Sequence, residues 1–462
     1  MSKAKSKRPP SHKANFDVLE QIEPNAAGID VGAMEVYVCV PAGRDDERVR
    51  SYATFTADLH RLADWLVHCG VETVAMESTG VYWITLYDIL EARGLRVCLV
   101  NARHLKNVSG RKSDVSDCQW LYQLHTYGLL RGSFHPPDDI RALRALARHR
   151  EMLVSYRAAH IQHMQKALEL MNLKLTYVLS DITGETGLQI IRAILTGERD
   201  PQVLAAYRHG RCKQSEAEIA KALSGNYRPE HLFTLQQALE LYETYGQQIA
   251  AVDAEMERLY KVLPPPDDGH ASQAKPPQPK SGKRRKNQAH FDLTQALYQV
   301  AGVDLTQIDG IEALTAQTII TEIGWDVSPW RTEKHFTSWL GLCPNNDVTG
   351  GKVKRRSTRK TSQRVATALR VAAQSLARSE SALGAFYRRI KARHGAPKAI
   401  VATAHKLARI VYHLLKHRTD YHDPGVDYYN QQQRERTINR LRKIAAKYDM
   451  VLQPQSSFSG AT

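Results

Sequence analysis

The sequence predicts an α/β domain at the N-terminus, followed by a long helical region and a mainly α-helical C-terminal domain. Short apolar strands alternate with helical stretches in residues 22–130, and residues 131–263 contain two long segments with helix-period apolar stripes. Residues 293–422 are rich in Ala and Leu. A chain of 462 residues is too long for one ordinary core, so several domains are expected.

The N-terminal elements alternate in a recognisable order. The predicted strands are 26–31, 35–40, 49–55, 74–77 and 96–100. The predicted helices are 57–69, 81–93 and a segment that Ser113 caps and that runs to about Tyr127. The first three strands form an antiparallel meander, and the whole order is βββαβαβα. This order describes a ribonuclease H-like sheet with helices on its faces.

The rest of the chain divides by composition. Apolar stripes at 140–171 and 233–263 predict two long helices that form a coiled coil or an extended arm, with a smaller helical insert at 181–228. A proline triplet and a KRRK run mark a linker, which we expect to be disordered. The expected parts are a disordered basic arm 1–21, an α/β domain 22–130, a helical coiled-coil region 131–263, a linker 264–292, a C-terminal domain 293–422 and a charged helical tail 423–462.

The charge balance favours a polyanionic partner. Lys and Arg number 64 against 48 Asp and Glu, a formal net charge of +16. The alternative is that the charge serves solubility alone. Membrane binding is not expected, because no apolar run approaches the length of a span and no strongly amphipathic basic helix carries Trp or Phe on its other face.

The cysteines and the N-terminus predict a cytoplasmic protein. Six cysteines are scattered without a CxxC pair or zinc-ligand spacing, which fits free thiols in a reducing compartment: Cys39, Cys69, Cys98, Cys118, Cys212 and Cys343. The first residues are Lys-, Ser- and Pro-rich and lack the apolar region of a secretory signal. A bacterial, nucleoid-associated location is expected.

Four acidic residues occupy positions where a carboxylate is not expected unless it has a structural or functional role. Asp30 lies near the end of the first apolar strand and Glu77 ends another, although burying an ionised group costs several kcal/mol unless it is paired or metal-bound. Asp114 and Asp117 lie three residues apart at the start of a helix, so they share one face near the positive end of its dipole.

In the predicted fold these four carboxylates crowd together. Each like-charge pair at about 4 Å costs roughly 4 kcal/mol at an effective dielectric of about 20, and divalent cations remove that cost. Mg²⁺ prefers a few carboxylates plus water and phosphate oxygens, and Mn²⁺ would serve as well. Two ions about 4 Å apart stabilise the attacking and leaving oxygens of a phosphodiester. The four acids therefore predict a two-metal site for phosphoryl transfer.

Each acid also has a simpler explanation. Asp114 fits a helix first turn with Asp117 merely solvated, and Asp30 fits a turn cap before Gly32. Glu77 fits an ion pair with Arg103 or Lys106. Any one of them is weak evidence. The order strand acid, strand acid, helix acid pair is more specific.

Several segments resemble one known family. GIDVGAMEVYVCV, AMESTGVYW and KSDVSDCQWL resemble the RuvC-like N-terminal domain of DEDD-type insertion-sequence transposases, the bridge-RNA-guided recombinases with a separate C-terminal transposase domain. IDGIEALTAQTIITEIGW, FTSWLGLCPNNDVTGGKV and ATALRVAAQS resemble the second domain. The resemblance covers roughly 22–130 and 300–420, in the order of the family.

The resemblance implies an activity and its parts. The four metal-binding acids of the family pattern fall on Asp30, Glu77, Asp114 and Asp117. The implied activity is cutting and rejoining DNA of a mobile element. A structured non-coding RNA pairs with donor and target DNA, and subunits joined by a coiled coil form a homo-oligomer, a dimer or a tetramer.

The resemblance also implies a hydroxyl nucleophile in the second domain. Members often carry Ser before Gly in the segment after LGLxP, and this chain has Thr349 there, in DVTGG. A threonine hydroxyl can attack, but its methyl group crowds the attack and it needs an activating base or metal. The alternative is that Thr349 only shapes a turn.

Basic segments near Thr349 predict contacts with nucleic acid. Six cations lie within nine residues and, with Gly350 and Gly351, suit a flexible loop against phosphates: Lys352, Lys354, Arg355, Arg356, Arg359 and Lys360. LTQIDGIEALTAQTII resembles a helix-hairpin-helix whose Gly310 turn aims amide groups at a phosphate; an ordinary αα-hairpin is the alternative. Arg388 and Arg389 begin a third basic stretch, which is also compatible with a solvated helix face.

Three functions fit these features. The first is a recombinase that uses the acids, metal and Thr349. The second is a RuvC-like structure-specific endonuclease that hydrolyses DNA with the acids alone. The third is a non-catalytic nucleic-acid-binding protein, against which the presence of all four acids argues.

Overall fold

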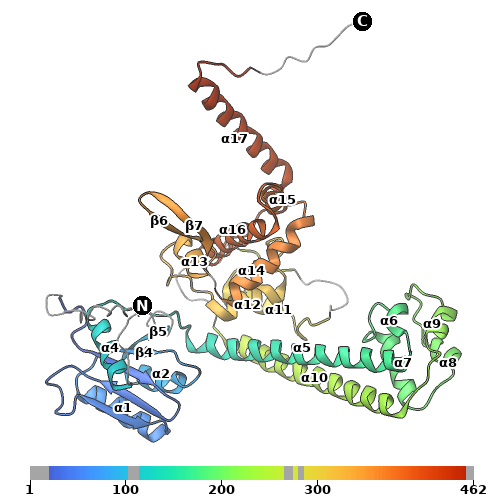
Figure 1. The fold of residues 1–462 in the computed structure, drawn as a ribbon, viewed down its shortest axis with the longest axis horizontal. Coiled ribbons are helices and arrows are strands. Elements are labelled where there is room, and N and C mark those ends of the chain that lie inside the picture. The colour runs from blue at the N-terminus through green and yellow to red at the C-terminus, as the bar shows by residue number, and fades with distance from the viewer. Residues whose placement is uncertain are drawn as a thin grey trace, which may run out of the picture. The chain divides into compact units, whose positions relative to one another are not determined.

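The computed structural model describes residues 20–101, 114–264, 274–278, 286–359, 361 and 363–453, without the side chains of 114–116, 347, 355 and 356. The chain forms two compact units, Met1–His135 and Pro136–Thr462. Within the described residues, the N-terminal unit contains a sheet covered by helices, and the second unit is built mainly from helices (Figure 1).

The N-terminal unit contains a five-stranded mixed sheet. Its strands are β1 (Ala26–Val31), β2 (Glu35–Cys39), β3 (Val49–Ala53), β4 (Thr73–Glu77) and β5 (Arg96–Val100). The strand order is β3-β2-β1-β4-β5, with β1, β2 and β3 antiparallel and β1, β4 and β5 parallel. The strands lie where the sequence predicts them, and the sheet is compatible with a ribonuclease H-like domain.

Helices cover both faces of this sheet. α1 (Thr56–His68) and α2 (Trp83–Ala92) form the main core with alternate residues of the strands, among them Ile29 and Met76. α4 (Asp114–Thr126) packs on the other face, where Leu121 contacts Ala75. Strand side chains alternate between the two faces, so each core uses every second residue of β1 and β4.

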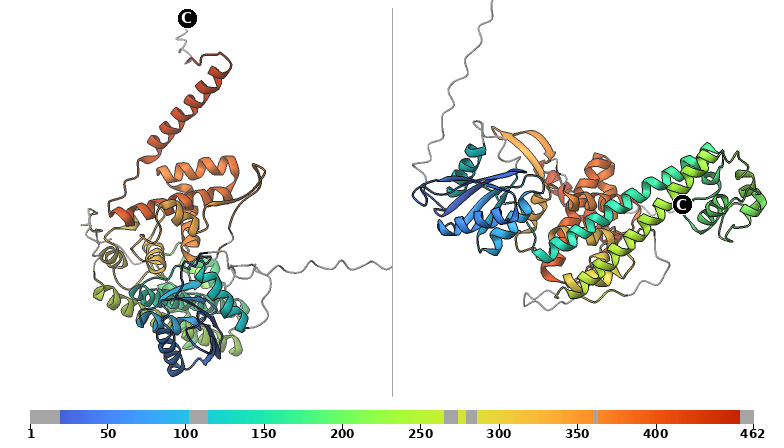
Figure 2. Two further views of the ribbon diagram at one scale, coloured as in Figure 1. Left: turned by 90° about the vertical axis from the view of Figure 1, so that its left-hand side faces the viewer. Right: turned by 90° about the horizontal axis from the view of Figure 1, so that it is seen from below.

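The second unit begins with two long antiparallel helices, α5 (Asp138–Leu170) and α10 (Pro229–Val262). Figure 2 shows them side by side, with a small helical lobe at one end. The lobe contains α6 (Leu175–Val178), α7 (Glu185–Leu195), α8 (Pro201–Ala205) and α9 (Glu216–Ala222), and packs against both long helices. A coiled coil between subunits stays a prediction.

A buried ion pair joins the two long helices. The Arg150 Nε of α5 donates to Asp253 Oδ1 of α10 at 2.5 Å, and both side chains are almost fully buried. The same carboxylate accepts from the backbone N–H of His290 at 3.2 Å, and His290 Nδ1 lies 2.6 Å from it. Within the predicted linker, the residues around His290 are therefore attached to the helix pair.

Helices dominate the remainder of this unit. They are α11 (Leu293–Ala301), α12 (Ala313–Ile323), α13 (Glu333–Trp339), α14 (Arg364–Ser375), α15 (Ala382–His394), α16 (Ala396–His417) and α17 (Gly425–Lys447), with short 3-10 turns at Leu305–Gln307 and Leu376–Arg378. None of the described helices is long and apolar enough to cross a membrane.

The segment after α13 corrects one expectation. Instead of a flexible loop, β6 (Pro344–Thr349) and β7 (Lys352–Thr358) form an antiparallel hairpin. Gly350 and Gly351 connect the strands with φ of 56° and 74°. Two glycines at positive φ match the two-residue turn that suits the twist of a hairpin, and this turn fixes the pairing of Thr349 with Lys352.

Candidate active site

Asp30 and Glu77 lie at the same level on neighbouring strands. β1 and β4 pair in parallel with Gly28 opposite Ala75 and Ile29 opposite Met76, so the next positions are Asp30 and Glu77. Paired strands lie about 4.8 Å apart. The sheet register thus brings together two acids that are far apart in the sequence.

Both acids belong to the face that α4 covers. Ile29 and Met76 lie in the core formed with α1 and α2. The alternate residues Gly28 and Ala75 contact α4, and alternation places Asp30 and Glu77 on this same face. The Thr79 hydroxyl donates to Glu77 Oε1 at 3.3 Å.

α4 runs antiparallel to β1 and β4 across this face. Its last residue, Thr126, accepts hydrogen bonds from the backbone N–H groups of Ile22 and Glu23, before β1 begins. The Thr73 hydroxyl at the start of β4 lies 2.9 Å from His125 Nε2. The N-terminus of α4 therefore points toward the ends of the strands that carry Asp30 and Glu77.

The direction of α4 also determines where Asp117 lies. It precedes Cys118, which packs on the sheet, and lies one helical turn before Leu121, which contacts Ala75. Residues four apart share one helix face, so Asp117 belongs to the sheet-facing side of α4, at its acid-bearing end. Its side chain is half-buried.

Gly28 allows α4 to approach this closely. A Cβ atom at Gly28 would lie 2.2 Å from the Cys118 carbonyl oxygen and 2.3 Å from the Tyr122 nitrogen, distances that no side chain tolerates. The absence of a side chain at Gly28 therefore sets the height of α4 above β1.

The contact between α4 and the sheet is apolar beside the acids. Cys39 and Cys118 are buried together with Tyr122. Burial raises the pKa of the Cys118 thiol to about 12, with the nearby Cys39 and Asp30 adding to the effect. Burial raises the pKa of Cys39 to about 11, against the opposing effect of Arg48. Both thiols are therefore neutral.

The donor chemistry of these residues fits a divalent ion, because carboxylate oxygens are the ligands that Mg²⁺ and Mn²⁺ prefer. Among the described side chains, no group of three Asp, Glu, His or Cys residues lies close enough to hold an ion. The Asp114 side chain is not among them; its backbone begins α4, one turn before Asp117. The predicted set of four acids stays a prediction.

Thr349 lies at the tip of the β6–β7 hairpin. It is the last residue of β6, pairs with Lys352 across the turn and is exposed. The hairpin presents the hydroxyl on a local ribbon, not in a buried pocket. The turn chemistry predicted for TGGK is present, and it is compatible with a nucleophilic role as well as with a purely structural one.

The hairpin also carries part of the predicted basic surface. Lys352 and Lys354 are exposed on β7, and Arg355 and Arg356 belong to the same strand. Lys360 lies outside the described residues. Arg359 has an internal partner, since its Nη2 donates to the Ser338 carbonyl oxygen at the end of α13 at 2.5 Å.

Other predicted contact residues have clear structural partners. A Cβ at Gly310, where φ is 84°, would lie 2.8 Å from the Ala372 carbonyl oxygen, so this turn packs closely on α14. Arg388 Nη1 donates to the Ser379 carbonyl oxygen at 2.6 Å, and Arg389 Nε donates to the Tyr429 hydroxyl at 2.7 Å. Contacts of these three residues with nucleic acid stay predictions.

Sequence reasoning missed two features of the site. The first is Gly28: a glycine inside an apolar strand signals a close backbone approach, and that signal was available in AAGIDVG. The second is the hairpin, whose signal was the Gly-Gly pair flanked by Val348 and Val353, which face each other across the strands.

Comparison with known families agrees with this architecture. Residues 27–173 match the model of DEDD transposases of the IS110 type, described as a transposase. Residues 302–388 match the model described as the transposase IS116/IS110/IS902 family. A search among curated proteins found no match. Two models of one family match in order over about half of the chain. The chain therefore belongs to the IS110-type DEDD transposases.

Proposed function

We propose that this transposase cuts and rejoins the DNA strands of a bacterial insertion sequence by metal-dependent phosphoryl transfer. Asp30, Glu77, Asp114 and Asp117 hold divalent ions, Mg²⁺ or Mn²⁺, on a ribonuclease H-like sheet of the RuvC type. The Thr349 hydroxyl acts as the nucleophile. The observation that carries the proposal is the antiparallel course of α4, which brings its acidic N-terminus toward the strand ends at Asp30 and Glu77.

The chemistry assigned to each part follows from its residues. Bound divalent ions stabilise negative charge on the attacking and leaving oxygens of a phosphodiester. The Thr349 oxygen forms a bond to phosphorus, its proton passes to water, and the bond from phosphorus to a deoxyribose oxygen breaks. The departing oxygen takes a proton, and the free deoxyribose hydroxyl of a second cut strand later attacks the threonine phosphodiester, which joins the two strands and releases the Thr349 hydroxyl.

The acids are tested by Asp30→Asn, which keeps the size of the side chain and removes its charge. We expect DNA rearrangement on a plasmid carrying element ends and target to fall below detection. The matched control is Asp88→Asn, an exposed acid on α2, on the opposite face of the sheet. Rearrangement by Asp30→Asn at the wild-type rate would contradict the proposal.

Thr349 separates the recombinase from the alternative endonuclease. Thr349→Ala should abolish strand exchange, while Thr349→Ser should retain it because the hydroxyl remains. In an endonuclease that uses the acids alone, Thr349→Ala would still cleave DNA. Cleavage and exchange are measured on the same labelled duplex, and continued cleavage with Thr349→Ala would favour the endonuclease.

The guide RNA and the homo-oligomer belong to the same proposal. The net charge of +16 supports a second polyanionic partner besides DNA. Sequencing of RNA that co-purifies with the transposase should recover a structured transcript from the flank of the gene, with segments complementary to the element end and the insertion site. Rearrangement by RNA-free protein would exclude the guide, and a monomer on target DNA would exclude the dimer or tetramer.

A further inference from the structure

α17 is strongly basic, and its first turns pack against α15. From Arg434 to Lys447 it contains six cations and one acid, Glu435. Tyr429, in its second turn, is its buried residue and packs on Phe386 of α15. The cations beyond it are exposed. In Figure 1 and in the left view of Figure 2, α17 extends away from the helices that hold its first turns.

Four of these cations form a single ridge. Arg436, Arg440, Lys443 and Lys447 follow one another at spacings of four, three and four residues. At about 100° per residue these positions lie within roughly 60° of one another around the helix, and the ridge is about 16 Å long at a rise of about 1.5 Å per residue. A row of like charges of this kind opposes isolated helix formation unless an anion neutralises it.

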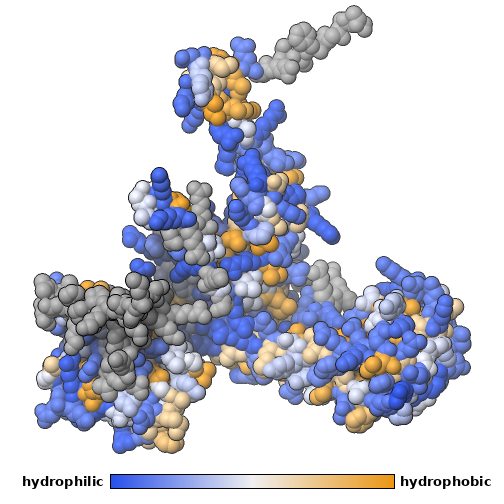
Figure 3. Space-filling model, viewed as in Figure 1, coloured by the Kyte–Doolittle hydropathy of each residue, from blue (hydrophilic) through white to orange (hydrophobic). Residues whose placement is uncertain are grey.

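The opposite side of α17 differs in character. Ile438, Leu441, Ala445 and Tyr448 repeat at spacings of three, four and three. They lie between about 110° and 190° around the helix from the centre of the basic ridge. Figure 3 shows hydrophilic residues along much of the drawn face of α17 and hydrophobic residues gathered toward its far end. Four of the six cations therefore share one side of the helix, while Arg434 and Arg442 lie on other sides.

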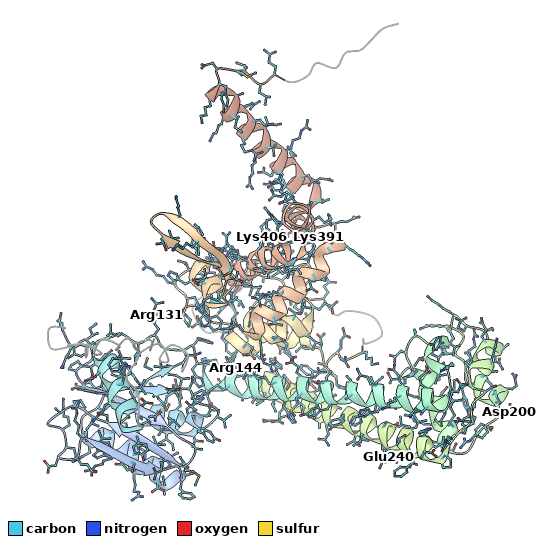
Figure 4. All side chains as sticks on the ribbon, in the orientation of Figure 1. Arg131, Arg144, Asp200, Glu240, Lys391 and Lys406 are labelled. Atoms are coloured by element: carbon cyan, nitrogen blue, oxygen red, sulfur yellow. The ribbon has the colours of Figure 1, made fainter. Side chains whose placement is uncertain are left out.

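The ridge begins beside a second group of cations. Lys406 Nζ of α16 lies 4.7 Å from the centre of the Phe386 ring and 5.6 Å from that of Tyr429. The Arg389 guanidinium of α15 also lies over these two rings, at 5.9 Å and 5.6 Å. Figure 4 labels Lys406 close to the point where α17 joins the other helices.

These cations act on one another. Burial lowers the pKa of Lys406, and the positive charges of Arg389, Arg409 and Arg436 lower it further, with Asp423 opposing them. Arg409 is paired with Glu333, its Nε donating at 2.9 Å. Asp423 accepts backbone hydrogen bonds from Ala382 and Gly425. Arg389, Lys406 and Arg436 thus share a strong positive potential, which an approaching anion relieves.

We infer that the basic ridge of α17, with Arg389 and Lys406 at its base, is a track that binds the sugar-phosphate backbone of duplex DNA. This inference rests on the proposed function, because it names the surface that holds the DNA. A continuous row of cations suits a polyanion with closely spaced charges, since each neutralised phosphate releases condensed counterions. Sequence is not read here, because backbone contacts position the DNA without specifying bases.

Two other polyanions are less compatible with this surface. The apolar side of α17 lacks the Trp and Phe that anchor basic helices in a membrane interface, which argues against a lipid surface as the partner. An RNA would meet the same charges, but both family models that match the chain describe transposases, whose substrate is DNA. Vesicles and RNA are therefore arms of the test.

The experiment compares two double variants of the full-length protein. Arg440→Gln with Lys443→Gln removes two charges from the ridge, and Arg434→Gln with Arg442→Gln removes two from other sides of the same helix. Gln has nearly the helix propensity of Lys and Arg, and circular dichroism verifies equal helicity. Binding to a 30-base-pair duplex is measured by fluorescence anisotropy in EDTA, at several salt concentrations.

The ridge variant should lose about two phosphate contacts. The slope of log affinity against log salt should then fall by about 1.8, which is a roughly sixtyfold weakening at 0.1 M salt. The control variant should bind almost as the wild type does. Equal losses in both variants, or no loss in either, would overturn the assignment of a track to this ridge.

Duplex RNA of the same sequence and phosphatidylserine vesicles complete the test. If the ridge charges matter for either of these and not for DNA, the assignment to DNA is overturned. Because EDTA prevents metal-dependent chemistry, Asp30→Asn should bind the duplex as the wild type does. A failed ridge test therefore leaves the acid site intact, and a failed acid site leaves the ridge result intact.

Discussion

The two regions that carry the proposed chemistry hold their residues by different physical means. Asp30 and Glu77 lie on a sheet whose register, burial and contact with α4 all fix their positions. Thr349 lies at the exposed tip of a two-stranded hairpin, and a Gly-Gly turn sets its place. A buried, five-stranded sheet is rigid, whereas an isolated hairpin is marginal in water. The positions of Asp30 and Glu77 are thus set by the sheet, while the position of the Thr349 hydroxyl depends on a local turn.

The largest effect is expected from Gly28→Ala, which tests the close contact between α4 and the sheet. The new methyl group would overlap the Cys118 carbonyl oxygen, so α4 must shift away from β1. We expect a loss of about 1–3 kcal/mol of stability, measured by urea unfolding, together with loss of DNA rearrangement. Gly132→Ala is the control, because its nearest neighbour, Cys98 Sγ, lies at an ordinary 3.6 Å. Unchanged stability of Gly28→Ala would mean that α4 is not seated as described.

A variant of the Gly350–Gly351 turn tests whether the hairpin positions Thr349. Gly350→Val places a β-branched residue at φ 56°, which costs roughly 1–2 kcal/mol within the hairpin. Because the hairpin tip is exposed, global unfolding should hardly change, while strand exchange should fall as Thr349 loses its place. Gly350→Asn should restore exchange, since Asn tolerates positive φ. Normal exchange by Gly350→Val would show that the turn does not position the nucleophile.

Much of the N-terminal fold was predictable because its signals are local. The apolar runs gave the strands, and Asp30 and Glu77 stood out because carboxylates end those runs. The antiparallel course of α4 depends on contacts such as Thr73 with His125, which no local pattern encodes. The hairpin was missed because the cations of β7 hide its alternation, and the paired Val348 and Val353 carry a weak signal. Arg359 and Arg388 were predicted to contact nucleic acid. Both are exposed and donate to backbone carbonyl oxygens, and their contacts with nucleic acid stay predictions.

The stability of the protein should depend on pH through His125, near the C-terminal end of α4. Burial lowers the pKa of His125 below its ordinary value. The unfolded chain therefore binds a proton more readily, so the stability from this group is present above about pH 6.5 and is lost as the pH falls below it. Urea unfolding between pH 7.5 and 5.5 should show this decline, and His125→Gln should reduce it. An identical decline in the variant would assign it to other groups.

The smallest effect concerns thiol reactivity as a reporter of α4 docking. Burial raises the pKa values of Cys39 and Cys118, so both should resist iodoacetamide at neutral pH in the native protein. Mass spectrometry should detect modification of these two thiols only after denaturation, and sooner in Gly28→Ala. Rapid modification of Cys118 in the native wild type would show that α4 leaves the sheet readily.

Metal binding tests the central claim most directly. Titration of Mn²⁺ into the wild-type transposase, followed by electron paramagnetic resonance, should show about two bound ions that compete with Mg²⁺. Asp30→Asn and Glu77→Gln should each weaken this binding strongly, while Asp88→Asn should bind as the wild type does. If Asp30→Asn and Glu77→Gln bound Mn²⁺ as tightly as the wild type, the acids on the α4 face of the sheet would not form the metal site.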